Sequence, residues 1–148
     1  MAGEKGNLNS QLFLEAVFQA VFTAIANIVQ NAASPLTNLY VSLHTADPTA
    51  AGNQGSSEAA YTGYARVAVA RTTSGWSITG ETITNVGAIN FPACTGGSET
   101  ETYVGVGVSG TTHDSGTLLW SGPLTSSLAV SNGITPSIAA GQLSITEG

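Results

Sequence analysis

A change in hydrophobic period at Pro35 constrains the fold of this chain more than any other feature of its sequence. Before Pro35 apolar residues recur with the period of a helix, whereas from Leu39 to His44 apolar and polar residues alternate as in a strand. Short segments rich in Thr, Val and Ile then follow one another, separated by turns that contain glycine. The expected strands are 39–44, 64–73, 76–78, 82–91, 102–108, 117–120, 128–131 and 142–146. About seven or eight such strands without intervening helices predict a mainly β protein, an antiparallel β-sandwich with jelly-roll-like topology. Greek-key packing of the immunoglobulin type is the alternative.

The stretch before Pro35 predicts one mostly buried N-terminal α-helix over 12–33. Glu15, Gln19, Thr23 and Asn27 recur every four residues and form one narrow polar stripe on an otherwise apolar helix. These polar side chains argue against a signal peptide or a membrane span.

The ends of this helix and the domain boundaries follow from the flanking residues. Asn9 or Ser10 is the expected N-cap, and Ser34 with Pro35 ends the helix. Residues 1–11 form a flexible N-terminal arm, because Gly, Asn and Ser cannot build a core. Residues 12–148 are expected to fold as a single domain.

Charge is scarce along the chain, and this restricts the partners that it can bind. Charged residues make up 8% of the sequence, and the net charge of −6 leaves three cations, too few to neutralise several phosphates. We therefore expect no nucleic-acid partner. We also expect no membrane partner and no cofactor. Cys94 is the single cysteine, so the chain has no internal disulfide and no cysteine-based metal site. A surface with so little charge favours association with other protein.

A long polar loop runs from Ala46 to Ala60, and its length suggests either a functional segment or an ordinary surface loop. In an assembled particle it could reach a neighbouring subunit. Both interpretations remain open from the sequence.

Some sequence patterns resemble catalytic motifs but lack the neighbouring residues or secondary structure that those motifs require. Gly105–Gly110 matches G-x-G-x-x-G, but it lies in an expected strand and precedes a turn, so small residues for close packing are the better interpretation. His44 and His113 could join Asp47 or Asp114 in a hydrolytic triad, yet no nucleophile elbow or metal-binding helix motif accompanies them. We expect no catalytic, cofactor-binding or metal-binding residues.

Two residue pairs could contact a carbohydrate. Glu99 and Glu101 share a strand face like glycosidase acids, but a solvated sheet edge is the better interpretation. Trp76 and Trp120 could stack on sugars, although core or contact roles are favoured.

Two sequence blocks resemble a known family. LYVSLHTADP at 39–48 and YTGYARVAVAR at 61–71, joined by a polar loop, resemble tailed-bacteriophage virion proteins often labelled tail fibre, whose members carry LYVALHTADP and GYARVAV. Further similar blocks occur at 76–92, 103–108, 118–125 and 138–146. The resemblance implies a structural protein of a virus particle rather than an enzyme.

Two functions agree with this resemblance. The one that we expect is a capsid cement protein, assembled in the host cytoplasm, that binds the major capsid protein on the outside of the head and associates with itself as a dimer or trimer. The compact size without repeats or a shaft favours it. The alternative is a tail-fibre or baseplate protein that takes part in binding a host receptor. The candidate interface residues are Leu8, Leu12, Phe13, Phe18, Phe22, Tyr61, Trp76 and Trp120.

Overall fold

The computed structural model describes residues 13–20 and 36–146, and these residues belong to two compact units. Of the described residues, the first unit comprises 13–20, 36–37, 70–88 and 139–146, and the second comprises Asn38–Val69 and Ile89–Ile138. The chain therefore passes from one unit to the other several times. The expectation of a single domain over 12–148 stays a prediction.

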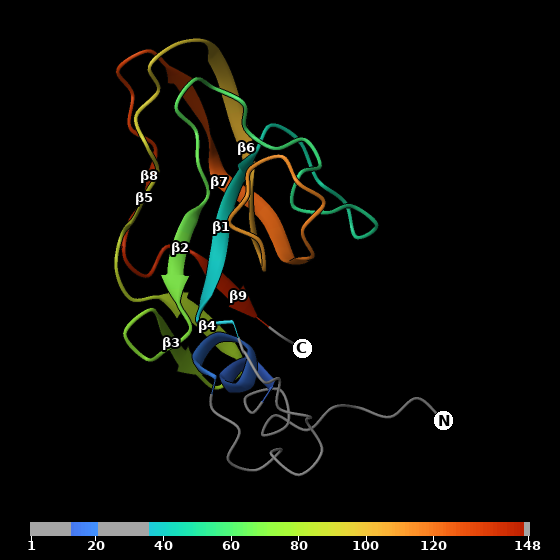
Figure 1. The fold of residues 1–148 in the computed structure, drawn as a ribbon. Helices are drawn as coiled ribbons and strands as arrows, with labels where there is room; N and C mark the ends of the chain where they lie inside the picture. Colours follow the sequence, from blue (N-terminus) through green and yellow to red (C-terminus); the bar gives the residue numbers. More distant parts are fainter. Residues whose placement is uncertain (1–12, 21–35, 147–148) are drawn as a thin grey trace. The chain divides into compact units, whose positions relative to one another are not determined.

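The second unit is built on a four-stranded sheet with the order β2-β1-β6-β7 (Figure 1). Its strands are β1 (Asn38–His44), β2 (Val67–Ala70), β6 (Ser98–Gly107) and β7 (Leu118–Ser131). Strand β6 runs antiparallel to both β1 and β7, with register shifts between Glu101 and Tyr103 and between Val106 and Gly107. A two-stranded pair, β5 (Ile89–Asn90) with β8 (Ser137–Ile138), completes the unit.

The alternation predicted for β1 is confirmed, but the strand is not half-buried. Leu39, Val41 and Leu43 lie on one face and are all buried, as the pattern requires. On the other face Ser42 and His44 are each 0% exposed. The segment after β1 folds back and covers this face, since His44 Nδ1 lies 2.9 Å from Ser56 O, Thr45 N donates to Ser57 O and Ala59 N donates to Leu43 O.

One long strand replaces the two strands predicted at 117–120 and 128–131. β7 continues through Gly122 and Pro123, the residues that separate the two predicted segments. Proline is compatible with an edge strand because its missing N–H need not reach a neighbour on the open side. The proline therefore does not end the strand.

The first unit contains a three-stranded sheet with the order β3-β4-β9 and one short helix. The strands are β3 (Trp76–Thr79), β4 (Thr82–Asn85) and β9 (Ser144–Thr146), and the helix η1 spans Glu15–Gln19. Phe18 packs edge-on against Trp76, with ring centroids 4.6 Å apart, and both side chains are fully buried. This pair anchors the helix to β3.

The helix predicted over 12–33 is interrupted at Ala20, which has a left-handed φ of 56°. Arg71 supplies a physical reason, because its guanidinium donates to Ala16 O and Val17 O, the carbonyls that would accept from the next helical turn. The N-cap, the helix after Ala20 and the arm lie outside the described residues.

The strand predicted at 82–91 is divided between β4 and β5. Asn85 Nδ2 donates to Gly87 O at 2.8 Å and to Ala139 O at 3.0 Å, and its Oδ1 accepts from Leu143 N at 2.9 Å. These bonds turn the chain directly after β4, so the strand cannot continue.

The fold class is mainly β with antiparallel sheets, as predicted, and the described residues contain one helix, shorter than the one expected. The jelly-roll topology is not shown, since no closed or curled sheet is found among the described strands. Within residues 13–20 and 36–146, no helix has the length and apolar character needed to cross a membrane.

Candidate functional site

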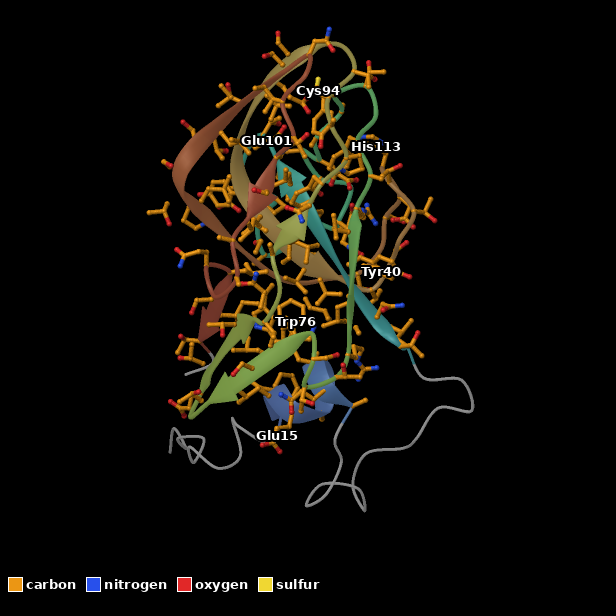
Figure 2. All side chains as sticks on the ribbon, turned by 90° about the vertical axis from the view of Figure 1, so that its left-hand side faces the viewer. Glu15, Tyr40, Trp76, Cys94, Glu101 and His113 are labelled. Carbon is orange, nitrogen blue, oxygen red and sulfur yellow. The ribbon has the colours of Figure 1, made fainter. Side chains whose placement is uncertain are left out.

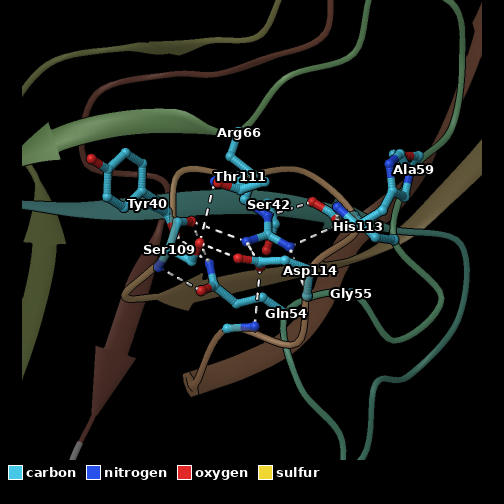
Figure 3. Close-up of polar contacts among 12 residues, drawn as sticks. Tyr40, Ser42, Gln54, Gly55, Ala59, Arg66, Ser109, Thr111, His113 and Asp114 are labelled. Atoms are coloured by element: carbon cyan, nitrogen blue, oxygen red, sulfur yellow. Dashed lines mark hydrogen bonds and ion pairs between the residues drawn. The ribbon is translucent and has the colours of Figure 1, made fainter.

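Buried polar side chains gather on one face of the four-stranded sheet, around Arg66 (Figure 3). Arg66 Nε and Nη2 donate to the two carboxylate oxygens of Glu58 at 2.6 and 2.8 Å. Arg66 Nη1 donates to Asp114 Oδ1 at 2.8 Å and to Ser109 O at 3.0 Å, and Nη2 also reaches Asp114 O at 3.4 Å. Every guanidinium N–H therefore has an acceptor. We call Glu58, Arg66, Ser109, His113 and Asp114 the Arg66 cluster.

Glu58, like Arg66, has several hydrogen-bond partners. Its carboxylate accepts from Tyr64 Oη at 3.0 Å and from His113 N at 2.7 Å, in addition to Arg66. His113 has a φ of 58°, uncommon for a residue with a side chain, and its Nε2 lies 2.9 Å from Ala59 O. These contacts fix the loop that contains Glu58 and the turn that contains His113 and Asp114.

The electrostatics of the cluster favour its charged forms. Burial alone would lower the pKa of Arg66, but the hydrogen bonds with Glu58 and Asp114 raise it. The hydrogen bonds from Ser109 and Arg66 lower the pKa of Asp114. Burial and the nearby Glu58 carboxylate raise the pKa of the Tyr64 hydroxyl, which therefore stays a donor. The cluster is an ion-pair network that holds two loops on the sheet.

Glycines in and after β6 make room for the side chains beside the cluster. A Cβ at Gly107 would lie 2.2 Å from Gln54 Cδ, and one at Gly105 would lie 2.6 Å from His44 Nε2. Gln54 is fully buried and accepts from Ser109 N at 2.8 Å. The glycine pattern at 105–110 is thus a packing feature, as predicted, and the backbone carbonyl of Thr117, 2.5 Å from a Cβ at Gly107, shares the space with these side chains.

Ser42 and His44 form a buried pair that resembles a catalytic dyad in composition alone. His44 Nδ1 lies 2.9 Å from Ser56 O, so it must carry the proton, and Nε2 then accepts from Ser42 Oγ at 2.9 Å. Burial lowers the pKa of His44, which favours this neutral form. Both residues are 0% exposed, so a substrate cannot reach the serine.

Glu101 is buried in a different way (Figure 2). Its side chain is fully buried, and neither carboxylate oxygen has a hydrogen-bond partner among the described residues. Burial and the neighbouring Glu99 raise the pKa of Glu101 to about 8. The solvated edge predicted for this pair is wrong because β6 is an interior strand, and Glu99 Oε1 accepts from Ala60 N and Tyr61 N at 2.8 Å.

A groove of about 530 Å³ opens between β7 and the segment after β1. Its walls come from the loop at 47–52, from Tyr103 on β6 and from the first part of β7. Asp47 at its rim is exposed, and its Oδ1 accepts from Thr49 N at 2.8 Å.

Residues 15–146 match the family of the podophage GP4 fiber I protein gp80. The chain belongs to this family. No similar sequence was found among curated proteins. The match covers nearly all of the chain and confirms the expected class, a structural protein of a bacteriophage virion. It also supports the alternative, a tail fibre, better than the expected capsid cement protein.

Membership of a fibre family confirms that this chain is not an enzyme. The residues weighed for a triad have separate partners. Asp114 binds Arg66 and Ser109, His113 contacts Ala59 O, and Asp47 binds its own loop. Among residues 13–20 and 36–146, no three His, Cys, Asp or Glu side chains gather closely enough to hold a metal ion.

The candidate interface residues of this fibre protein lie in different surroundings. Phe18, Trp76 and Tyr61 are 0%, 0% and 4% exposed, so they contribute to intrachain packing. Phe13 is 43% exposed and Trp120 is partly exposed, so both offer surface to a partner. Leu8, Leu12 and Phe22 lie outside the described residues. Contact with a partner stays a prediction for all of these positions.

Sequence reasoning missed the Arg66 cluster and the burial of Gln54 and Glu101. One signal was present, since Arg66 directly precedes an apolar strand in a chain with three cations. If a charge in that position is buried, it needs a nearby carboxylate.

Proposed function

We propose that this chain is a structural component of a phage tail fibre and works through protein contacts rather than chemistry. The observation that carries the proposal is the family match over residues 15–146. The Arg66 cluster supports it, because polar groups that are paired with one another stabilise loop positions and are not available to react with a substrate.

The capsid cement function has less support. No family relation favours it, and the jelly-roll topology that contributed to it is not shown. Binding to the major capsid protein and a place on the outer capsid therefore stay predictions of that interpretation.

The location of the protein in the particle tests the proposal. Antibodies against the purified protein, visualised with gold by electron microscopy of intact virions, should label the tail region. Preimmune serum is the control. Label distributed over the head would contradict the proposal and favour cement.

A second candidate function, contact with a host surface glycan, is favoured by the groove beside β7. Tyr103 supplies an aromatic surface and Asp47 a hydrogen-bond acceptor, a combination that suits a sugar ring. The protein should bind surface polysaccharide from host cells, and Tyr103→Ala should weaken binding at least tenfold. Tyr40→Ala is the matched control, because Tyr40 lies on β1 and does not line the groove. Equal binding by the two variants would contradict this role.

A further inference from the structure

Glu99 and Glu101 lie two residues apart on β6, so their side chains leave the same face of the strand. Glu101 is fully buried, and neither of its carboxylate oxygens has a hydrogen-bond partner among the described residues (Figure 2). Burial and the neighbouring Glu99 both raise the pKa of Glu101, so the two carboxyl groups lie close to each other. Buried charges in proteins are normally paired or bound to a metal.

No cation among the described residues is free to neutralise this pair. Arg66 donates to the carboxylates of Glu58 and Asp114. Arg71 donates to backbone carbonyls of the first unit. The third cation of the chain, Lys5, lies outside the described residues. A positive partner for the two acids must therefore come from elsewhere.

The polar groups beside the pair already have partners. Burial and then the charge of Glu101 raise the pKa of the Tyr61 hydroxyl to about 12, but this hydroxyl donates to Pro92 O at 2.9 Å. Glu99 accepts from Ala60 N and Tyr61 N at 2.8 Å. Both of these bonds end on Oε1 of Glu99, which leaves its Oε2 for another partner. Three carboxylate oxygens, both of Glu101 and one of Glu99, are thus available to a ligand.

We propose that these oxygens bind one calcium ion, with Glu101 as a bidentate ligand and Glu99 bound through Oε2. Ca²⁺ takes about six to eight oxygen ligands and accepts bidentate carboxylates in irregular arrangements. Glu99 is partly exposed, so water reaches the ion from its side and completes the coordination shell. Mg²⁺ suits the site less well, because it gives up its water reluctantly and the buried Glu101 carboxylate requires an ion that does so.

The affinity of this site should be modest, because it has two acidic side chains rather than three or more. The number of charged ligands helps to set calcium affinity, and weak sites have dissociation constants on the order of 10⁻⁴ to 10⁻³ M. The ion connects β6 through Glu99 to the backbone at 60–61, so binding should stabilise the fold. This proposal replaces the sequence-based expectation that the chain has no metal-binding residue.

Thermal unfolding tests whether calcium stabilises the chain. After removal of divalent ions with EDTA, about 10 mM CaCl₂ at pH 8 should raise the unfolding midpoint by about 3 to 6 °C. NaCl at the same ionic strength should not raise it, and MgCl₂ should raise it less. Glu101→Gln keeps the size of the side chain but removes its charge, so it should abolish the calcium effect. Glu81→Gln, the same change in the turn after β3, is the matched control and should retain the effect.

Equilibrium dialysis with radioactive calcium tests binding separately from stability. The unmodified chain should bind about one ion per molecule, and Glu99→Gln and Glu101→Gln should each weaken binding by about tenfold or more. Glu99→Gln retains an oxygen that can accept from Ala60 N and Tyr61 N. Its loss of binding would therefore follow from the missing charge and not from a displaced loop.

Three results would overturn the proposal. One is an unfolding midpoint that calcium raises no more than NaCl does. Another is a calcium effect that Glu101→Gln retains, which would place the ion elsewhere on the chain, for example at the exposed Asp47. The third is equal stabilisation by Mg²⁺. If Glu101→Gln does not fold, dialysis of Glu99→Gln decides, because calcium binding as tight as that of the unmodified chain would exclude this site.

Discussion

Glu58 and Glu101 are both buried in the second unit, yet their surroundings are opposite. Glu58 accepts bonds from Arg66, Tyr64 and His113, whereas neither carboxylate oxygen of Glu101 has a partner among the described residues. A buried carboxylate with a full set of donors can stay charged and fix the loops around it. A buried carboxyl without donors is favoured in its neutral form. The effect of a buried acid on the structure therefore depends on whether hydrogen-bond donors surround it.

Removing Arg66, the cation that pairs with Glu58, should leave both buried acids without a counterion. Of the changes considered, it should lower the free energy of unfolding most. Arg66→Ala leaves Glu58 buried without its counterion, so urea denaturation at pH 7 should show a loss of about 3 to 5 kcal/mol in the free energy of unfolding. The double variant Arg66→Met with Glu58→Leu should recover much of this loss, because no charge remains buried. A loss below about 1 kcal/mol in the single variant would mean that the ion pair does not hold the loops.

The buried carboxyl of Glu101 should make the stability of the protein depend on pH. The pKa of Glu101 is raised in the folded state from 4.5 to about 8, so the folded state holds the extra proton between these values. Stability contributed by the neutral acid is therefore complete below pH 4.5 and decreases as pH rises toward 8, by about 1.4 kcal/mol per pH unit at most.

Glu101→Gln should remove this decrease and make the protein more stable than the unmodified chain at pH 8, by about 2 to 4 kcal/mol, with little difference at pH 4. Thermal denaturation across this range is the measurement. Glu81→Gln, in the turn after β3, is the control and should leave the slope in place. If the stability of Glu101→Gln decreased with pH as steeply as that of the unmodified chain, Glu101 would not be the source of the pH dependence.

Filling the space beside the Arg66 cluster should lower the free energy of unfolding by an intermediate amount. Gly107→Ala forces Gln54 away from Ser109 N, and we expect a loss of about 2 kcal/mol in the free energy of unfolding. Gly122→Ala on β7 is the matched control, because a Cβ there meets nothing within 4 Å. Equal stability of the two variants would contradict the packing role of the β6 glycines.

Loss of the partly exposed carboxylate of the Arg66 cluster, Asp114, should lower stability least. The Asp114 side chain is 35% exposed, so Asp114→Asn should lower the free energy of unfolding in urea at pH 7 far less than Arg66→Ala does. Comparison with Arg66→Ala then separates the buried ion pair from its partly solvated neighbour. A loss as large as that of Arg66→Ala would place the main stabilisation at Asp114 instead of Glu58.

The local part of the fold could be predicted from the sequence, because the information lies within each segment. Alternation at 39–44 locates β1, and short Thr, Val and Ile-rich segments indicate a mainly β protein. The continuity of β7 through Pro123 could not be foreseen, since it depends on the strand lying at an edge.

The candidate site could not be predicted, because its partners are distant in sequence. Arg66 and Asp114 are 48 positions apart, and Gln54 and Ser109 are 55 apart. The polar loop at 46–60 gave no sign that Gln54 and Glu58 would be buried. Glu101 was expected at a solvated edge because strand order, which places β6 inside the sheet, is not contained in the pattern of one strand.

The copy number of this chain relative to the major capsid protein, from quantitative mass spectrometry of purified virions, tests the central claim most directly. A fibre component should be present at a few to a few dozen copies per particle, far below the capsid protein. A ratio near one, or a simple fraction such as one half, would contradict the fibre assignment and identify a protein that covers the capsid.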